Sequence, residues 1–193
     1  MTPLQRAETL HCTASELLQE MTVVSLFSQV GHIHTVGSYR LNVMYRPDID
    51  LIVATEAPTR EQATRLTKLL LDQREFQSVG FADYVSYRKP SVTKGFYWEL
   101  ITPYANDWWK FDIWYLAPED DTAIAPAEHF ERLLDGNPAA RETILRIKEH
   151  FFDGVKYRAG ITGFAIYDAV LNHGVSSLAE FIQAWDMATR APR

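Results

Sequence analysis

The sequence of 193 residues has only one cysteine, Cys12, and no long run of apolar residues. A single cysteine cannot form a disulfide within the chain, and it excludes a zinc site built from several cysteines. No apolar stretch reaches the roughly 20 residues that a membrane-spanning helix needs. The first residues also lack a basic segment followed by an apolar core. We therefore expect no signal peptide, no membrane association and a cytoplasmic location.

Basic residues are also scarce relative to acidic ones. The chain has 19 Lys and Arg residues against 25 Asp and Glu residues, which gives a formal net charge of −6. A protein that grips nucleic acid needs a basic surface to neutralise the phosphates, so nucleic acid is not an expected partner. The acidic balance instead suits a small substrate together with a magnesium ion.

Hydrophobic periodicity divides the chain into a mixed first part and a helical second part. In the first part the pattern predicts helices at Leu4–Phe27 and Thr59–Gln73, strands at Ile33–Val36, Asp48–Ala54, Gly95–Thr102 and Trp109–Leu116, and a turn at Pro103–Asp107. It predicts a strand or an irregular hairpin arm at Phe76–Tyr87. Later it predicts only helices, at Pro126–Leu134, Pro138–Phe151, Thr162–Asn172 and Leu178–Ala188. This order predicts an α+β fold. Residues 1–120 would form a mixed sheet with helices on one face, and residues 121–193 a helical region packed on that core.

Two aspartates, Asp48 and Asp50, stand one residue apart in a predicted strand. Because a strand alternates its side chains, both carboxylates should point to one face and the apolar residues beside them to the other. Such neighbours raise each other's pKa unless a cation lies between them. Magnesium binds a few carboxylate oxygens together with substrate phosphates. The pair alone leaves two interpretations open, a metal site or solvated aspartates on an edge strand.

A Gly-Ser pair precedes the two aspartates. Gly37 follows a predicted strand, where a glycine lets the backbone turn sharply and approach a phosphate closely. Ser38 adds a hydroxyl and an amide N–H that can bind phosphate oxygens. These two residues on their own also fit an ordinary turn.

The combined spacing is more specific than either part. An apolar residue and Gly-Ser ("VGS", 36–38), nine further residues, and then Asp-apolar-Asp-apolar ("DIDL", 48–51) follow one another in the chain. This pattern resembles the signature of the nucleotidyltransferase superfamily, which has the DNA polymerase β-like fold. In that family the loop between the two parts often has a basic residue followed by a glycine. Here the basic residue is Arg40, and Leu41 and Asn42 follow it.

The resemblance implies roles for five residues. Asp48 and Asp50 would bind metal and take part in catalysis. Gly37 and Ser38 would contact the nucleotide. Arg40 resembles the basic residue of the family's loop and would contact the nucleotide too.

The family usually carries a third carboxylate on a later strand, and Asp112 in "WKFDIWYL" is the first candidate. An aspartate inside an aromatic strand costs stability unless it has a partner. The resemblance implies that this partner is a metal ion and that Asp112 is catalytic. A salt bridge to Lys110 or an exposed edge strand would also account for it, and Glu99 in "YWELIT" is the second candidate for the third carboxylate.

Other conspicuous side chains receive structural interpretations. Most aromatic residues between Phe81 and Tyr115 are expected to pack the sheet, and only Trp114, on the face of Asp112, is kept as a candidate for stacking. Lys89, Lys94 and Lys110 are expected to contact mainly water.

The resemblance also implies a reaction. Two magnesium ions about 3.5–4 Å apart would steady the attacking and leaving oxygens at the α-phosphate of a nucleoside triphosphate such as ATP. The antibiotic-modifying members of the family suggest a hydroxyl of a small molecule of the aminoglycoside type as the acceptor. Two alternatives stay open, a protein-AMPylating antitoxin and a nucleotide-binding module without catalysis. The sequence leaves the base, the acceptor and the formation of a homodimer open.

Overall fold

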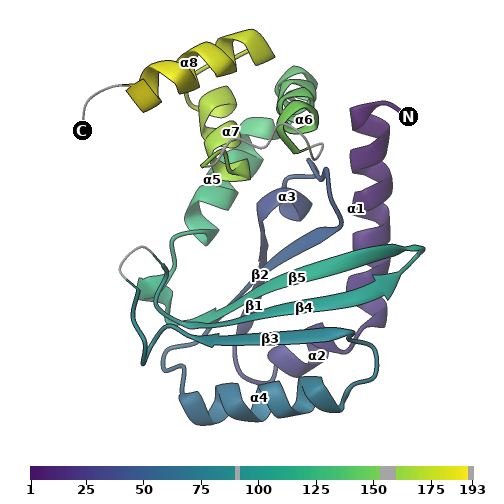
Figure 1. Ribbon diagram of the computed structural model, residues 1–193, viewed down its shortest axis with the longest axis vertical. Helices are drawn as coiled ribbons and strands as arrows, with labels where there is room; N and C mark the ends of the chain where they lie inside the picture. Colours follow the sequence, from purple (N-terminus) through teal and green to yellow (C-terminus); the bar gives the residue numbers. More distant parts are fainter. Residues whose placement is uncertain (90–91, 153–159, 191–193) are drawn as a thin grey trace.

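The computed structural model describes residues 1–89, 92–152 and 160–190. Its centre is a five-stranded mixed sheet in the order β1-β2-β5-β4-β3 (Figure 1). The strands are β1 His32–Val36, β2 Asp48–Ala54, β3 Ser78–Asp83, β4 Phe96–Tyr104 and β5 Asp107–Leu116. Strands β2 and β5 run parallel, and the other neighbours run antiparallel. The predicted α+β class with a mixed sheet is confirmed.

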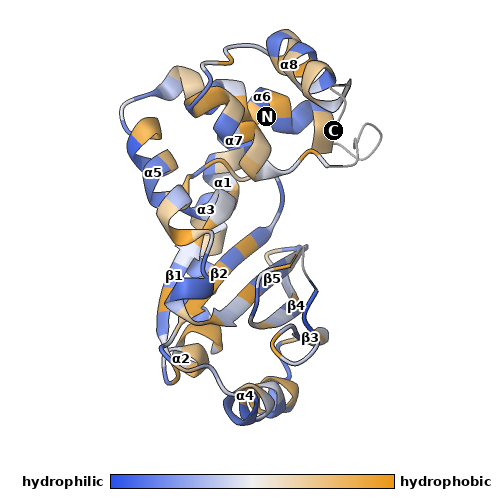
Figure 2. Cartoon of the chain, turned by 90° about the vertical axis from the view of Figure 1, so that its left-hand side faces the viewer, coloured by the Kyte–Doolittle hydropathy of each residue, from blue (hydrophilic) through white to orange (hydrophobic). Residues whose placement is uncertain are grey.

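Helices flank the sheet at two opposite ends of the molecule. They are α1 Pro3–Glu20, α2 Val23–Phe27, α3 Gly37–Arg40, α4 Arg60–Asp72, α5 Ile124–Leu134, α6 Pro138–Phe152, α7 Gly163–Leu171 and α8 Leu178–Arg190, with a 3-10 turn at Pro118–Asp120. Helices α5–α8 gather at one end and α2 and α4 at the other, with the sheet between them (Figure 2). Within the described residues, no helix is long and apolar enough to cross a membrane.

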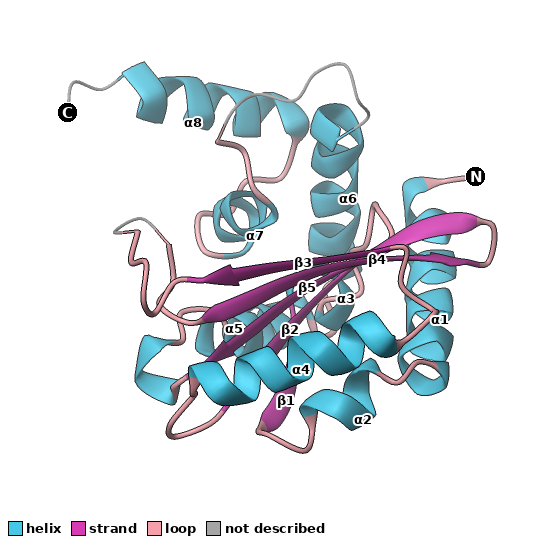
Figure 3. Cartoon of the chain, turned by 60° about the horizontal axis from the view of Figure 1, so that its bottom comes forward, coloured by secondary structure: helices cyan, strands magenta, loops and turns pink. Residues whose placement is uncertain are grey.

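One face of the sheet builds the main hydrophobic core. Helices α1, α2 and α4 cover this face, and α4 and α2 lie across it in Figure 3. The core is formed by alternate strand residues such as Leu51, Trp98 and Ile113, of which at most 1% is exposed. Full burial of one such side chain contributes about 1.5–3 kcal/mol. This face therefore holds the sheet in place. The other face carries a smaller apolar cluster that includes Ile52 and Leu116, and it also leaves room for polar side chains.

The C-terminal helices form a second core of their own. Phe130, Ile144, Ile166 and Phe181, from α5, α6, α7 and α8, are buried together. Ala7, Leu41 and Val43 from the first part of the chain join the same cluster. The helical character of the second part is confirmed, whereas a domain boundary at residue 120 stays a prediction.

The predicted helix Leu4–Phe27 is wrong in one respect, because the chain forms two helices there. Helix α1 ends at Glu20, and the following residue, Met21, has an extended backbone with φ −83° and ψ 152°. The Thr22 hydroxyl donates a hydrogen bond to the carboxylate of Glu75. The sequence pattern did not reveal this break, because Met21 and Val23 beside it are both apolar and both lie in the main core.

Two further boundaries differ from the sequence prediction. The turn predicted at Pro103–Asp107 is only Ala105-Asn106, whose φ angles of 49° and 65° match a tight hairpin that leaves the strands longer. The strand predicted at Phe76–Tyr87 is β3, Ser78–Asp83. It ends there because the Asp83 carboxylate accepts hydrogen bonds from the backbone N–H groups of Val85 and Ser86.

Candidate active site

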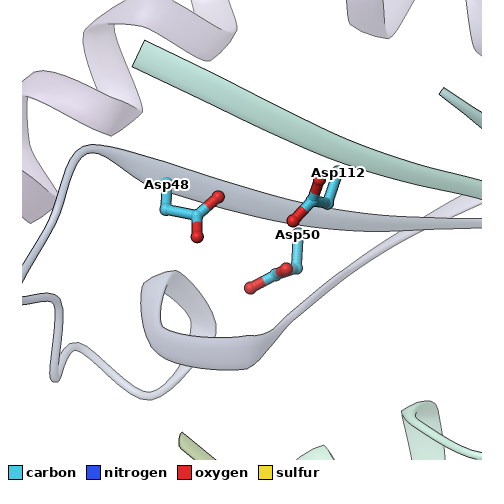
Figure 4. Close-up of side chains that lie close together, drawn as sticks. All are labelled: Asp48, Asp50 and Asp112. Atoms are coloured by element: carbon cyan, nitrogen blue, oxygen red, sulfur yellow. The ribbon is translucent and has the colours of Figure 1, made fainter. Parts of the chain in front are cut away.

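Strands β2 and β5 bring three aspartates together on the open face of the sheet. Asp50 lies directly beside Asp112 in the parallel register, and Asp48 lies beside Lys110. The three side chains extend to the same side of the sheet (Figure 4). One oxygen from each carboxylate lies within 4.8 Å of the other two. The structure thus shows the cluster that strand alternation and the candidate third carboxylate suggested.

Gly37 is the residue that makes room for this cluster. Its φ of +64° lies in the left-handed region, where other residues are strained. A Cβ atom on Gly37 would lie 2.0 Å from Asp50 Oδ2. Glycine is therefore needed for both the backbone conformation and the space. The one-turn helix α3 begins with the Gly-Ser pair, and its first residue packs directly against the carboxylate of Asp50.

The carboxylates are costly to keep charged in this position. Burial raises the pKa of Asp50 to about 7, and the neighbouring charges of Asp48 and Asp112 add to the effect. Burial also raises the pKa of Asp48, although the nearby Lys110 opposes the shift. A cation that approached these oxygens would remove both penalties.

Lys110 and Tyr97 supply the contacts that hold Asp112. The Lys110 ammonium lies 2.7 Å from Asp112 Oδ2 and 3.4 Å from Asp48 Oδ2. The Tyr97 hydroxyl donates a hydrogen bond of 2.5 Å to Asp112 Oδ1. Burial alone would lower the pKa of Lys110, but the hydrogen bond to Asp112 and the charge of Asp48 outweigh it and raise the pKa. The expectation that Lys110 contacts mainly water is wrong, and the salt bridge considered as an alternative coexists with the acidic cluster.

The residues present fit a divalent cation. Asp48 Oδ1 is buried and has no hydrogen-bond partner among the residues that the structure describes. Such an atom loses its hydration without compensation unless a ligand meets it. Carboxylate oxygens are the ligands that magnesium prefers. Asp48, Asp50 and Asp112 are therefore the side chains that could hold Mg²⁺.

A cavity of about 690 Å³ lies against the three carboxylates. Gly37, Ser38 and the aspartates line its polar side. Its other walls are largely apolar and aromatic, and they include Trp114 from the sheet and Phe130, Phe152, Phe164 and Tyr167 from the C-terminal helices. Such a mixture of apolar walls and a few convergent polar groups is typical of a small-molecule site.

Lys148 on α6 is a site residue that the sequence analysis missed. It is only 3% exposed, lines the cavity and donates a hydrogen bond of 2.8 Å to the carbonyl oxygen of Val43. Burial lowers its pKa to about 7, and the charges of Asp50 and Asp48 work against that shift. Its helical spacing from Ile144 and Phe151 was a usable signal, because it places a lysine on the apolar stripe of the helix.

The other predicted residues are placed as follows. Ser38 and Trp114 line the cavity, and Trp114 is flanked by Tyr84 and Tyr97 at ring-centroid distances of 5.6 and 5.0 Å. Glu99 is exposed and faces Asp112 across the strand pair, outside the group of three carboxylates.

The structure does not bring Arg40 into the cavity with the aspartates. Its Nη2 atom lies 2.8 Å from Glu131 Oε2 of α5, and the two residues line a different hollow. The loop residue that resembled the family's basic residue thus ties α3 to α5.

Neither a protein-family model nor a curated protein matches the sequence. Solved structures do match. The polymerase core of TRAMP, an RNA surveillance complex, superposes with a TM-score of 0.53 and 15% identity over 97% of this chain and 58% of that one. The non-canonical poly(A) polymerase complex GLD-2–GLD-3 gives a TM-score of 0.55 and 12% identity over 92% of this chain and 61% of that one. The chain thus spans about 60% of either protein, and such identities show a shared fold alone.

Proposed function

We propose that this chain, which adopts the nucleotidyltransferase fold, transfers a nucleoside monophosphate from a nucleoside triphosphate to a hydroxyl group. The observation that carries the proposal is that carboxylate oxygens of Asp48, Asp50 and Asp112 lie within 4.8 Å of one another. They line a cavity that Gly37 also lines. A similar fold supports nucleotide chemistry but does not establish it, so the proposal rests on the site.

Each side chain has a distinct task in this proposal. Asp48, Asp50 and Asp112 would hold divalent ions, which would neutralise charge on the phosphates and lower the pKa of the acceptor hydroxyl. Asp112 would also take the proton of that hydroxyl, since the hydrogen bond from Tyr97 fixes the orientation of its carboxylate.

The chemistry balances as a single displacement at phosphorus. The acceptor oxygen forms a bond to the α-phosphorus, and the bond from that phosphorus to the oxygen bridging to the β-phosphate breaks. Pyrophosphate leaves, and the hydroxyl proton passes to Asp112. The hydroxyl of Ser38 and the ammonium of Lys148 line the same cavity and would contact phosphate oxygens.

The acceptor in this proposal is a small molecule. The apolar and aromatic walls would exclude water from the reacting groups, and the net charge of −6 disfavours a polyanionic acceptor. The two similar structures are a polymerase core of an RNA surveillance complex and a poly(A) polymerase complex, whereas this chain has no excess of basic residues. A cationic, hydroxyl-rich antibiotic of the aminoglycoside type is the first acceptor class to test.

A transfer assay tests the proposal. The purified chain is incubated with Mg²⁺ and each of the four α-labelled nucleoside triphosphates, together with aminoglycosides, lincosamides, a protein mixture or an RNA oligonucleotide. We expect label on a small molecule, with loss of transfer in EDTA. Label on protein would favour AMPylation, and label on RNA would favour a polymerase. Nucleotide binding without transfer to any acceptor would favour a non-catalytic module.

A further inference from the structure

The acidic cluster already contains a positive charge of its own. The Lys110 ammonium contacts Oδ2 of both Asp48 and Asp112, at 3.4 and 2.7 Å. Lys110 projects from β5 two residues before Asp112, so strand alternation places it on the face that carries the carboxylates. With a third of its side chain exposed, it has a route to move outward without unfolding the strand.

The carboxylates that Lys110 contacts are two of the three that could hold a divalent ion. Of the four oxygens on Asp48 and Asp112, two accept from Lys110 and a third accepts from Tyr97. The fourth, Asp48 Oδ1, is buried and has no hydrogen-bond partner in the described parts of the chain. An ammonium group and a divalent cation cannot approach the same two oxygens together, because like charges repel.

One ammonium does not satisfy three carboxylates. Lys148 also lies near the cluster, but its ammonium is hydrogen-bonded to the carbonyl oxygen of Val43 and acts on Asp50 and Asp48 through its charge alone. The cluster is thus held together but left short of positive charge. A dication brings twice the charge of Lys110 to the same oxygens.

We propose that Lys110 is the resident counter-ion of Asp48 and Asp112, and that a divalent cation binds these carboxylates only by displacing its ammonium group. The proposal rests on the proposed function insofar as it takes the aspartates as metal ligands. The displaced ammonium finds a new partner in the triphosphate, which carries negative charge into the same cavity. Metal alone therefore binds weakly, and metal and nucleotide strengthen each other's binding.

Direct metal binding tests this competition without any measurement of activity. Mn²⁺ affinity is measured by titration calorimetry on the full chain in the absence of nucleotide, for the parent protein and for Lys110→Met, which keeps the length of the side chain but not its charge. We expect Lys110→Met to bind Mn²⁺ about 10-fold more tightly, within the usual range of coupling between two sites. An unchanged or weaker affinity would overturn the proposal.

Two further variants separate competition from a general effect of charge. Lys110→Arg keeps the cation beside the carboxylates and should bind Mn²⁺ no more tightly than the parent. Lys94→Met removes a lysine that pairs with Asp120 at 3.0 Å, outside the acidic cluster, and should leave the affinity unchanged. A gain in Lys94→Met as large as that in Lys110→Met would contradict a local competition.

Thermal unfolding gives a second readout. In EDTA, Lys110→Met should melt below the parent, because Asp48 and Asp112 then lack their contacting cation, and Mn²⁺ should restore most of the loss. A variant that unfolds in EDTA and regains its fold with Mn²⁺ supports the proposal, and one that stays unfolded with Mn²⁺ contradicts it. If neither protein binds Mn²⁺, the metal site of the proposed function fails as well, whereas equal tight binding overturns only the role of Lys110.

Discussion

The two faces of the central sheet differ in what stabilises them. On the covered face, Ile49, Leu51 and Ile113 are at most 1% exposed and pack against α1, α2 and α4. On the open face, the neighbouring residues of the same strands include Asp50 and Asp112, whose carboxylates converge. The covered face is complete on its own, because its apolar side chains find apolar partners within the chain. The open face needs a cation to become electrically balanced.

This contrast separates fold from chemistry along a single strand. Asp112 and Ile113 are consecutive residues of β5 and point to opposite faces. Ile113 contributes to the stability of the core, and Asp112 contributes to the candidate site. Substitutions on the covered face should cost stability and spare the site. Substitutions of the carboxylates on the open face should cost function and spare, or even raise, the stability of the protein without metal. The predictions below test that separation, from the largest expected effect to the smallest.

Asp112→Asn should have the largest effect. An amide keeps the shape of the side chain but cannot accept the hydroxyl proton, so we expect the turnover number to fall by about 10²–10⁴-fold. Asp48 and Asp50 still offer carboxylates to the metal that accompanies the nucleotide, so MgATP affinity should stay near that of the parent. Single-turnover transfer and calorimetry measure the two quantities separately. Transfer at the parent rate would remove Asp112 from catalysis.

Ile113→Ala should show the opposite behaviour. Ile113 is fully buried against the covering helices, and truncation of such a residue to alanine typically costs about 2–5 kcal/mol of the free energy of unfolding. Mn²⁺ affinity should remain that of the parent, because the side chain points away from the carboxylates. Denaturant unfolding and calorimetry give both values. A marked loss of metal affinity would show that the two faces are not independent.

The pH dependence of stability should reveal Asp50. Its pKa is raised from an ordinary 3.8 to about 7, so the folded state binds this proton more tightly than the unfolded state does. The resulting stabilisation is present below about pH 4 and is lost as the pH rises to about 7. Above that, the lowered pKa of Lys148 acts in the opposite direction.

The variant Asp50→Asn isolates this contribution. In EDTA, the free energy of unfolding of the parent should fall by a few kcal/mol relative to Asp50→Asn between pH 4 and pH 7, at about 1.4 kcal/mol for each unit of pKa shift. Denaturant unfolding at several pH values provides the comparison. If the free energies of unfolding of the two proteins change with pH in parallel, the pKa of Asp50 is not raised by folding.

Arg40→Ala should have the smallest effect. Arg40 pairs with Glu131 outside the cavity, and an exposed pair of this kind typically contributes about 0–1 kcal/mol to the free energy of unfolding. Nucleotide affinity should not change, whereas Ser38→Ala should lower it, because Ser38 lines the cavity. Equal losses in the two variants would favour the sequence-based assignment of Arg40 to the nucleotide.

Local patterns were sufficient to predict much of this fold. The strand Asp48–Ala54 has the predicted boundaries, since it is rich in Ile, Leu and Val. The helix after Thr59 also follows the prediction, because Thr59 and Gln62 form the expected capping box. The break at Met21 and the tight two-residue form of the predicted turn, Ala105-Asn106, escaped prediction. The first depends on the distant Glu75, and the second requires an alanine in a conformation that alanine rarely adopts.

The candidate site shows a similar division. Asp48 and Asp50 follow from one short motif. Asp112 was proposed because the resembling family carries a third carboxylate on a later strand, and because a charge among aromatic strand residues needs a partner. The contacts of Lys110 and Tyr97 with Asp112 depend on which strands are neighbours, which no local pattern specifies. The placement of Lys148 depends on how α6 meets the loop at Val43. Arg40 was assigned to the nucleotide by resemblance alone, and no local pattern predicts that it pairs with the distant Glu131.

One measurement tests the central claim, that three carboxylates on the open face hold a divalent ion. Crystals grown with Mn²⁺ and a non-hydrolysable ATP analogue should be measured at a wavelength where manganese scatters anomalously. We predict an anomalous peak bound by oxygens of Asp48, Asp50 and Asp112, with the triphosphate on the same side. A nucleotide bound without a peak at these oxygens, or a peak elsewhere, would contradict the account.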